Sequence, residues 1–259
     1  MDCIYIKSPH EIELMRQAGR ITAGARSIAR QAVADGVTTK QIDKCVHEFI
    51  VKSGAKPTFL GYGGFPGNAC VSVNDEIIHG IPGSKVIHNG DIVSLDVGAT
   101  YKGFVGDCAG TFPCGEISDE AKNLIAVTRQ SFFEGLKFAK VGYRISDIGA
   151  AIQEYVESHG YSVVREYVGH GIGREMHEAP EVPNYRVPRR QRGNRPDPRL
   201  VKGMTIAIEP MVNVGSCEIR VLDNKWTVVT MDGSLSAHYE NTIAITDGEP
   251  EILTMAEDI

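Results

Sequence analysis

The sequence lacks the cysteine pattern of a disulfide scaffold and any long hydrophobic run. Its six cysteines are irregularly spaced and form no CxxC pair: Cys3, Cys45, Cys70, Cys108, Cys114 and Cys217. This usage favours free thiols in a reducing compartment. No apolar run approaches the ~20 residues that cross a bilayer, and the chain opens without a secretory signal. We therefore expect a soluble, cytoplasmic protein with no membrane partner.

An excess of positive charge is also missing. The chain has 27 Lys and Arg residues against 33 Asp and Glu residues, a net charge of −6, whereas nucleic-acid-binding domains usually have a basic balance. Apolar and charged residues make up 42% and 23% of the chain, as in ordinary globular proteins. Its 259 residues could form one large domain or two small ones. We expect no DNA partner and, without an obvious exposed apolar stripe, a monomer.

The order of the predicted elements repeats once along the chain. A capping box from Ser8 to Glu11 predicts a first helix, which carries apolar residues at Ile12, Met15, Ile21, Ala25 and Ile28. Further helices are expected after Thr39, Ser118 and Ser146, and strands over about 57–112 and from about 162 onward. Helix, helix, strands therefore occurs twice, which indicates an α/β fold with an internal duplication.

The stretch "SLDVGATYKGFVGDCAGTF" (94–112) places two carboxylates in an otherwise apolar hairpin. With a two-residue loop at Tyr101 and Lys102, Asp96 would lie directly opposite Asp107, whereas a three-residue loop with a bulge would shift the register. Buried like charges that face each other are destabilising. A shared proton, an Arg or Lys partner, or a bound metal ion would relieve this repulsion. The hairpin contains no Arg, and its one Lys, Lys102, lies at the exposed turn. The other interpretation of the two aspartates is that they lie on a solvent-exposed face of the hairpin and are not buried.

The second half of the chain offers a matching carboxylate pair. The segment "NGDIVSLD", which ends at Asp96, resembles "KGMTIAIE", which ends at Glu209. In the same way, "VGD", which ends at Asp107, has a counterpart in "HYE", which ends at Glu240. Four converging carboxylates require cations. Oxygen-rich sites bind hard or borderline divalent ions, and one nitrogen ligand shifts the preference toward Fe, Mn, Co or Zn.

Three histidines are candidates for that nitrogen and for catalysis. His170 lies between glycines in "VGHGIGREMHEAP", His177 follows in the same segment, and His79 lies in "IIHGIP". Two carboxylate-bridged divalent ions would activate a water and polarise a carbonyl, which is metal-assisted hydrolysis of an acyl bond. A carboxylate can relay the proton, and a histidine can bind the developing oxyanion. The histidines on helices or polar loops are interpreted as ordinary: His10, His47, His88 and His159.

Together these motifs resemble type I methionine aminopeptidase over residues 3–253. The motifs are "HGIP", "DVGATYKGFVGDCAGTF", "GHGIG", "MHEAP", "IEPM" and "SAHYENT". The resemblance implies the pseudo-two-fold "pita-bread" fold, an α/β (α+β) arrangement in which a curved antiparallel sheet is flanked by two helix pairs. It implies one catalytic domain over 1–259, with halves of about 1–115 and 116–250.

The resemblance also implies the metal ligands. Asp107 and Glu240 would bridge two divalent ions, with Asp96 completing the shell of one, and His170 and Glu209 that of the other. Glu209 would shuttle the proton of the bridging water.

The implied reaction is removal of the initiator methionine from nascent polypeptides whose second residue is small. His177 would contact the scissile carbonyl region, and His79 would position the substrate main chain and stabilise the intermediate. The implied methionine pocket consists of apolar and aromatic residues, which suit a thioether: Phe59, Tyr62, Phe65, Cys70, Met176 and Trp226. Phe65 and Met176 replace a common Tyr and Phe of the family, and both remain apolar.

One basic segment belongs to none of these motifs. Six arginines and three prolines lie between Tyr185 and Leu200, and they predict a solvated loop. Because basic clusters bind phosphates, the hypothesis is that 186–199 contacts ribosomal RNA or the nascent-chain exit region.

Three alternatives share this fold. A proline-specific (Xaa-Pro) peptidase usually has an extra N-terminal domain, but only about 80 residues precede His79. A type II methionine aminopeptidase carries a helical insertion for which the length leaves little room. A non-enzymatic binding protein on the same fold would lose metal ligands, and all five are present here.

Overall fold

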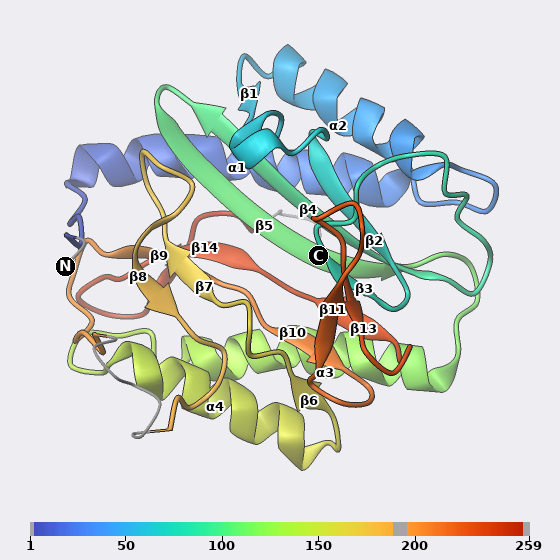
Figure 1. The fold of residues 1–259 in the computed structure, drawn as a ribbon. Coiled ribbons are helices and arrows are strands. Elements are labelled where there is room, and N and C mark those ends of the chain that lie inside the picture. Colours follow the sequence, from blue (N-terminus) through green and yellow to red (C-terminus); the bar gives the residue numbers. More distant parts are fainter. Residues whose placement is uncertain (1–2, 189–195, 256–259) are drawn as a thin grey trace.

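Two helix pairs frame the strands of the protein. The computed structural model describes residues 3–188 and 196–255. The first pair is α1 (Pro9–Gln31) and α2 (Thr39–Lys52), and the second is α3 (Asp119–Leu136) and α4 (Ile145–Ser158). Figure 1 shows the first pair along the top of the view and the second along the bottom, with the strands between them. A short 3-10 helix, η1, spans Tyr62–Gly64.

Each helix pair is followed by strands. The first set is β1 (Lys56–Pro57), β2 (Ala69–Val73), β3 (Glu76–Ile78), β4 (Ile92–Tyr101) and β5 (Phe104–Pro113). The second set is β6 (Ser162–Val163), β7 (Gly169–Gly171), β8 (Glu178–Val182), β9 (Thr205–Ile208), β10 (Met211–Asn213), β11 (Ile219–Val221), β12 (Val228–Thr230), β13 (Ser236–His238), β14 (Asn241–Ala244) and β15 (Glu251–Ile252). The predicted order of helix, helix, strands in both halves is confirmed.

The helix starts follow the capping chemistry. At α1, the Ser8 hydroxyl accepts a bond from the Glu11 amide, and the Glu11 carboxylate accepts one from the Ser8 amide, as predicted. The predicted start of α4 after Ser146 is wrong, because this helix begins at Ile145. The Ser146 amide and hydroxyl both donate to the carboxylate of Asp197, which lies in a distant loop. Ser146 therefore belongs to the first turn and does not cap the helix.

All paired strands among the described residues are antiparallel. They form four groups, with orders β1-β4-β2 (β5 also pairing with β4), β13-β10-β6, β11-β12-β3 and β15-β14-β9-β7-β8. The two halves join where β5 runs antiparallel to the segment leading into β14. There the Ala109 and Glu240 main chains exchange two hydrogen bonds of 3.2 and 3.0 Å, and the Thr242 hydroxyl bonds both the amide and the carbonyl of Asp107.

The hairpin of β4 and β5 differs from the predicted register. The loop consists of Lys102 and Gly103, both with positive φ, of 49° and 79°, as a tight two-residue hairpin turn requires. Asp96 therefore lies opposite Ala109, and Asp107 lies opposite Gly98. The predicted direct opposition of the aspartates is wrong by two residues. Because a shift of two preserves the face of the strand, both carboxylates remain on one face as diagonal neighbours.

The cores of the two halves lie between each helix pair and its strands. In the first half, Ile42, Val46 and Ile50 of α2 pack with Val71 and Leu95 of the sheet. In the second half, the largest apolar cluster joins α3 and α4 to β9, β10 and β14. A search of the described residues finds no helix long and apolar enough to cross a membrane.

Candidate active site

Five predicted metal ligands converge on the junction between the two halves. Asp96 and Asp107 project from the middle of β4 and β5, and His170 projects from β7. Glu209 directly follows β9, and Glu240 directly precedes β14. Because Asn241 pairs with Ile208, the two glutamates flank the same point of the sheet.

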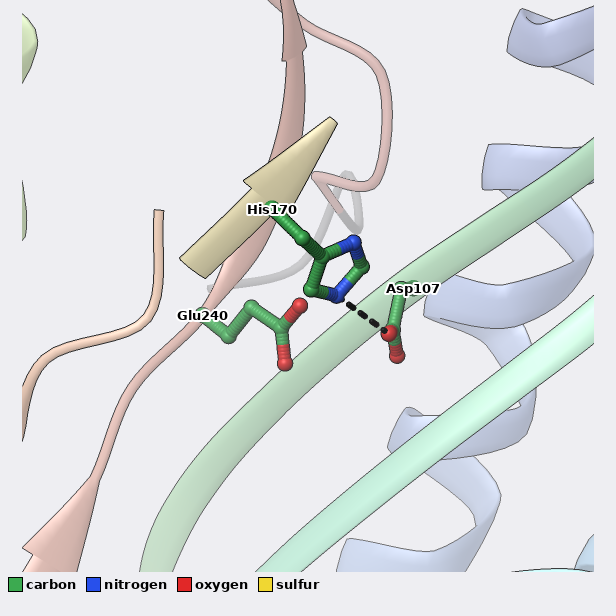
Figure 2. A group of neighbouring side chains, drawn as sticks. All are labelled: Asp107, His170 and Glu240. Carbon is green, nitrogen blue, oxygen red and sulfur yellow. Dashed lines mark ion pairs between the residues drawn. The ribbon is translucent and has the colours of Figure 1, made fainter. Parts of the chain in front are cut away.

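Three of these side chains are close enough to hold one ion. One ligand atom each from Asp107, His170 and Glu240 lies within 4.8 Å of the other two, and Figure 2 shows the three groups pointing toward one another. His170 Nε2 is 3.8 Å from Asp107 Oδ2 and 3.5 Å from Glu209 Oε1. Asp96 adjoins Asp107, to which it is hydrogen-bonded.

The imidazole of His170 is oriented for metal binding. Its Nδ1 lies 2.8 Å from the carbonyl oxygen of Gly171, so Nδ1–H donates to that carbonyl and the lone pair is on Nε2. Burial lowers the pKa of His170 to about 3, so the ring is neutral at physiological pH. Nε2, which faces the carboxylates, is therefore free to bind a cation.

Burial raises the pKa of all four carboxyl groups. For Asp96 it raises the pKa to about 7, against the opposing effects of the hydrogen bonds to Asp107 and Cys70. For Asp107, Glu209 and Glu240, burial and the neighbouring carboxylates raise the pKa well above its usual value. Without cations, the site therefore retains protons at neutral pH.

The donor set fits divalent cations. Asp96 Oδ1, Asp107 Oδ1 and Glu240 Oε1 are buried and have no hydrogen-bond partner, which is costly for oxygen atoms that could accept bonds. Four carboxylates and one preset imidazole nitrogen are ligands that Mn, Fe, Co and Zn accept. A cation at this point would satisfy the unpaired oxygens and remove the repulsion among the carboxylates.

The two other predicted histidines lie beside this cluster. The ring centroids of His177 and His170 are 4.3 Å apart, and His177 Nδ1 is 2.7 Å from the Tyr62 hydroxyl. His79 follows β3 with a φ of 57°, a backbone conformation that residues other than glycine rarely adopt. Its ring packs edge-on against Tyr167. Burial lowers the pKa of His79 to about 4 and also lowers that of His177.

Most of the predicted pocket residues gather in one apolar cluster next to the carboxylates. Phe65 and Trp226 pack at right angles with centroids 5.1 Å apart, and Cys70 pairs with Asp96 across β2 and β4. Tyr62 is outside this cluster, is 43% exposed, and contacts His177 instead. The predicted members that belong to the cluster are Phe59, Phe65, Cys70, Met176 and Trp226.

Two residues near the site were not predicted from the sequence. Arg26 of α1 is 2% exposed, and its Nη1 donates to the carbonyls of Ala109 and Glu240. His238 lies two residues before Glu240, with Nε2 4.0 Å from Glu240 Oε2 and both ring nitrogens unpartnered. His238 had a signal in the sequence, because it lies two residues before Glu240. No local pattern marks Arg26, whose carbonyl partners are 83 and 214 residues away.

A third unpredicted contact anchors the segment that carries His177. Lys7 Nζ is 2.5 Å from Glu178 Oε2, and both side chains are buried. The other carboxylate oxygen of Glu178 accepts from the amides of Arg174 and Glu175. The N-terminal segment thus fixes the loop that carries His177, and no sequence pattern links these distant positions.

Comparisons with known proteins agree with this geometry. The profile of "Metallopeptidase family M24" matches residues 13–247. The methionine aminopeptidase of Clostridium acetobutylicum is 56% identical over 98% of this chain and 100% of its own length. Methionine aminopeptidase 1 of Bacillus subtilis is 50% identical over 97% and 99%. The crystal structure of the Thermotoga maritima methionine aminopeptidase superposes with a TM-score of 0.93 at 46% identity, covering 98% of this chain and 100% of that one.

These likenesses extend over nearly the whole chain, and they confirm the predicted fold class along with the resemblance. The chain belongs to metallopeptidase family M24 and, within it, to the methionine aminopeptidases.

Proposed function

We propose that this enzyme removes the N-terminal initiator methionine from nascent polypeptides whose second residue is small. The observation that carries the proposal is the convergence of Asp107, His170 and Glu240 within 4.8 Å beside an apolar cluster. The near full-length identity to proteins named methionine aminopeptidase supports the same activity.

The metal centre of the proposal uses two divalent ions. Asp107 and Glu240, the carboxylates at the junction of the two halves, would each contact both ions. Asp96 would complete one shell, and His170 with Glu209 the other. The 3.5 Å separation of His170 Nε2 and Glu209 Oε1 supports the second grouping. Fe, Mn, Co and Zn all suit this donor set.

Divalent ions, when bound here, supply a Lewis acid for the scissile carbonyl and lower the pKa of water. Glu209 has the position for a proton carrier, because it lies at the edge of the cluster with its side chain 13% exposed. Burial and the charges of Asp107 and Asp96 raise its pKa. A carboxylate with a raised pKa can take a proton from the attacking water and pass it to the leaving amine.

The two histidines would bind the peptide bond being cleaved. If the Tyr62 hydroxyl donates to His177 Nδ1, the ring carries its proton on Nε2 and can donate to the carbonyl oxygen of the substrate. Such a donor stabilises negative charge that develops in the transition state. His79, neutral and buried against Tyr167, would hold the main chain of the substrate.

Specificity for methionine would come from the cluster of Phe59, Phe65, Cys70, Met176 and Trp226. An unbranched thioether makes favourable contacts with aromatic and soft side chains. The substitutions that set this chain apart, Phe65 and Met176, keep the cluster apolar, so the preference for methionine is retained.

Peptide cleavage tests the function against the Xaa-Pro peptidase. Purified protein loaded with Mn, Fe or Co is assayed on Met-Ala-Ser, Met-Lys-Ser and Ala-Pro-Ala, alongside Asp107→Asn. We expect methionine release from the first peptide alone and at least a ~100-fold loss in the variant, the size of effect expected when a residue essential to catalysis is removed. Cleavage of Ala-Pro-Ala would favour the proline-specific peptidase. No cleavage with any metal would favour a non-enzymatic binder.

The basic segment 186–199 is proposed to contact ribosomal RNA. Its arginines at 189, 190, 192 and 195 lie outside the described residues. Near its end, Arg199 Nη1 donates to the Gly142 carbonyl, and Asp197 bonds the first turn of α4. Replacing the arginines of the segment by alanine should weaken ribosome binding and flatten its salt dependence. An unchanged salt dependence would contradict the contact.

A further inference from the structure

Arg26 is a buried cation directly behind the carboxylate cluster. It lies on the face of α1 that packs against β5, where Gly19 and Gly106 approach so closely that a Cβ on Gly106 would lie 2.9 Å from the Gly19 backbone. Its Nη1 lies 2.9 Å from the Ala109 carbonyl and 3.2 Å from that of Glu240. The guanidinium thus reaches the point where the two halves join.

The carboxylates have no other fixed positive partner in residues 3–188 and 196–255. The ion pairs of Asp107, Glu209 and Glu240 involve only His170 and His238, and no Lys or Arg side chain among the described residues forms an ion pair with any of the four carboxylates. Arg26 carries a permanent charge and reaches the cluster through the main-chain carbonyl of Glu240.

The guanidinium is poorly hydrated, so its charge acts strongly on its surroundings. Besides the two carbonyls, Arg26 borders a cavity of about 40 Å³ between α1 and α3, with room for only a few waters. The other lining residues include Phe112, Ile125 and Tyr239. At a low local dielectric constant, Coulomb interactions with charges nearby are large.

We propose that Arg26 acts as a built-in charge compensator: it stabilises the carboxylate cluster when no metal is bound and thereby limits the affinity of the site for divalent ions. This inference rests on the metal centre proposed above. A cation behind the site attracts the carboxylates and repels incoming dications. Because binding and stability are linked, whatever stabilises the metal-free state more than the loaded state weakens metal binding.

The charge of Arg26, rather than its hydrogen bonds, produces this effect. The Ala109 and Glu240 carbonyls already accept a main-chain hydrogen bond from each other's residue. Replacing Arg26 by methionine, which is similar in length, therefore leaves both carbonyls paired. A residue that merely positioned Glu240 would have the opposite consequence, since its loss would weaken metal binding.

The test compares Arg26→Met, Arg26→Lys and the parent after metal is stripped with chelator. Mn²⁺ affinity is measured by calorimetric titration, and Tm is measured with chelator and with saturating Mn²⁺. We expect Arg26→Met to bind Mn²⁺ about tenfold more tightly than the parent. We also expect its Tm to fall further below that of the parent in the metal-free protein than in the Mn²⁺-loaded protein. Arg26→Lys, which keeps the charge, should bind as the parent does. The matched control is Arg129→Met, an exposed arginine on the same cavity, which should leave the affinity unchanged.

The Mn²⁺ affinities of the variants separate this inference from the proposed function. Equal or weaker binding by Arg26→Met, or tightening in Arg26→Lys as large as in Arg26→Met, overturns the inference while the proposed function stands. If metal-free Arg26→Met does not fold, Mn²⁺ should restore cooperative unfolding, and failure to fold in both conditions overturns the inference. A parent that binds no Mn²⁺ overturns the proposed metal centre and this inference with it.

Discussion

Burial governs the protonation state of each residue in the proposed metal site. The carboxyl groups of Asp96, Asp107, Glu209 and Glu240 all have raised pKa values, that of Asp96 reaching about 7, while burial holds His170 neutral. Metals bind the deprotonated carboxylates and the neutral imidazole. The histidine is therefore ready to bind a cation, whereas the carboxyl groups must first lose protons.

We predict that Mn²⁺ binding releases protons and strengthens as the pH rises from 6 to 8. The sign follows from the raised pKa of Asp96: below about 7 this group is largely protonated, so the metal must displace a proton, and above it the displacement costs less. Calorimetry at pH 6 and pH 8 in two buffers of different ionisation enthalpy measures the protons released. An affinity independent of pH, with no proton release at pH 6, would show that the carboxyl groups are already ionised.

We also predict that Tyr62→Phe lowers kcat about three- to tenfold, the effect of losing one hydrogen bond, with little change in KM. The variant removes the 2.7 Å contact between the Tyr62 hydroxyl and His177 Nδ1, so the imidazole loses the partner that sets its tautomer. Tyr5→Phe, at a tyrosine that is 61% exposed, is the matched control. Steady-state kinetics on Met-Ala-Ser distinguish the two, and an unchanged kcat in Tyr62→Phe would mean that the contact does not set the tautomer.

At the scale of elements, small residues let α1 approach the sheet. The fully buried positions of α1 include Met15, Ala18, Ala25 and Ala29, whereas Ile12, Ile21 and Ile28 are only partly buried. A Cβ on Gly19 would lie 2.1 Å from the Leu253 carbonyl oxygen. The close approach of α1 brings Arg26, its one buried charged residue, to the carboxylates of the proposed metal site.

We therefore predict that Gly19→Ala destabilises the protein by about 1–3 kcal/mol, the typical cost of overpacking a filled interior, despite alanine's better helix propensity. Gly24→Ala on the same helix is the matched control, because its Cβ would meet only the end of the Phe49 ring, which can move. Urea unfolding measures both free energies. Equal stabilities for the two variants would contradict the rigid packing of α1.

Local signals predicted the elements, and longer-range contacts decided the details. The start of α1 follows from Ser8 and Glu11, which are three residues apart. The start of α4 has a local signal that the sequence analysis missed, Asp147, whose carboxylate accepts from the Arg144 amide three residues earlier. It is also held by Asp197, some fifty residues away. The hairpin register depended on which two residues form the loop. Lys102 and Gly103 do so, both with positive φ, so the aspartates are diagonal neighbours.

At the scale of the whole molecule, two similar halves each contribute two carboxylates to one centre. The matches of Asp96 with Glu209, and of Asp107 with Glu240, were visible in the sequence because strand carboxylates amid apolar residues are rare. The contributions of Arg26 and Lys7 were not, because each acts across the fold on a partner more than eighty residues away. Sequence patterns thus indicate ligands, whereas the residues that support them emerge from packing.

The central claim is that the junction of the two halves binds divalent ions, and anomalous diffraction from a crystal soaked in Mn²⁺ tests it most directly. We predict two anomalous peaks between Asp107 and Glu240, one also touched by Asp96 and the other by His170 Nε2 and Glu209. Crystals of Asp107→Asn should lose at least one peak. Manganese bound elsewhere, with no peak within reach of Asp107 and Glu240, would contradict the claim.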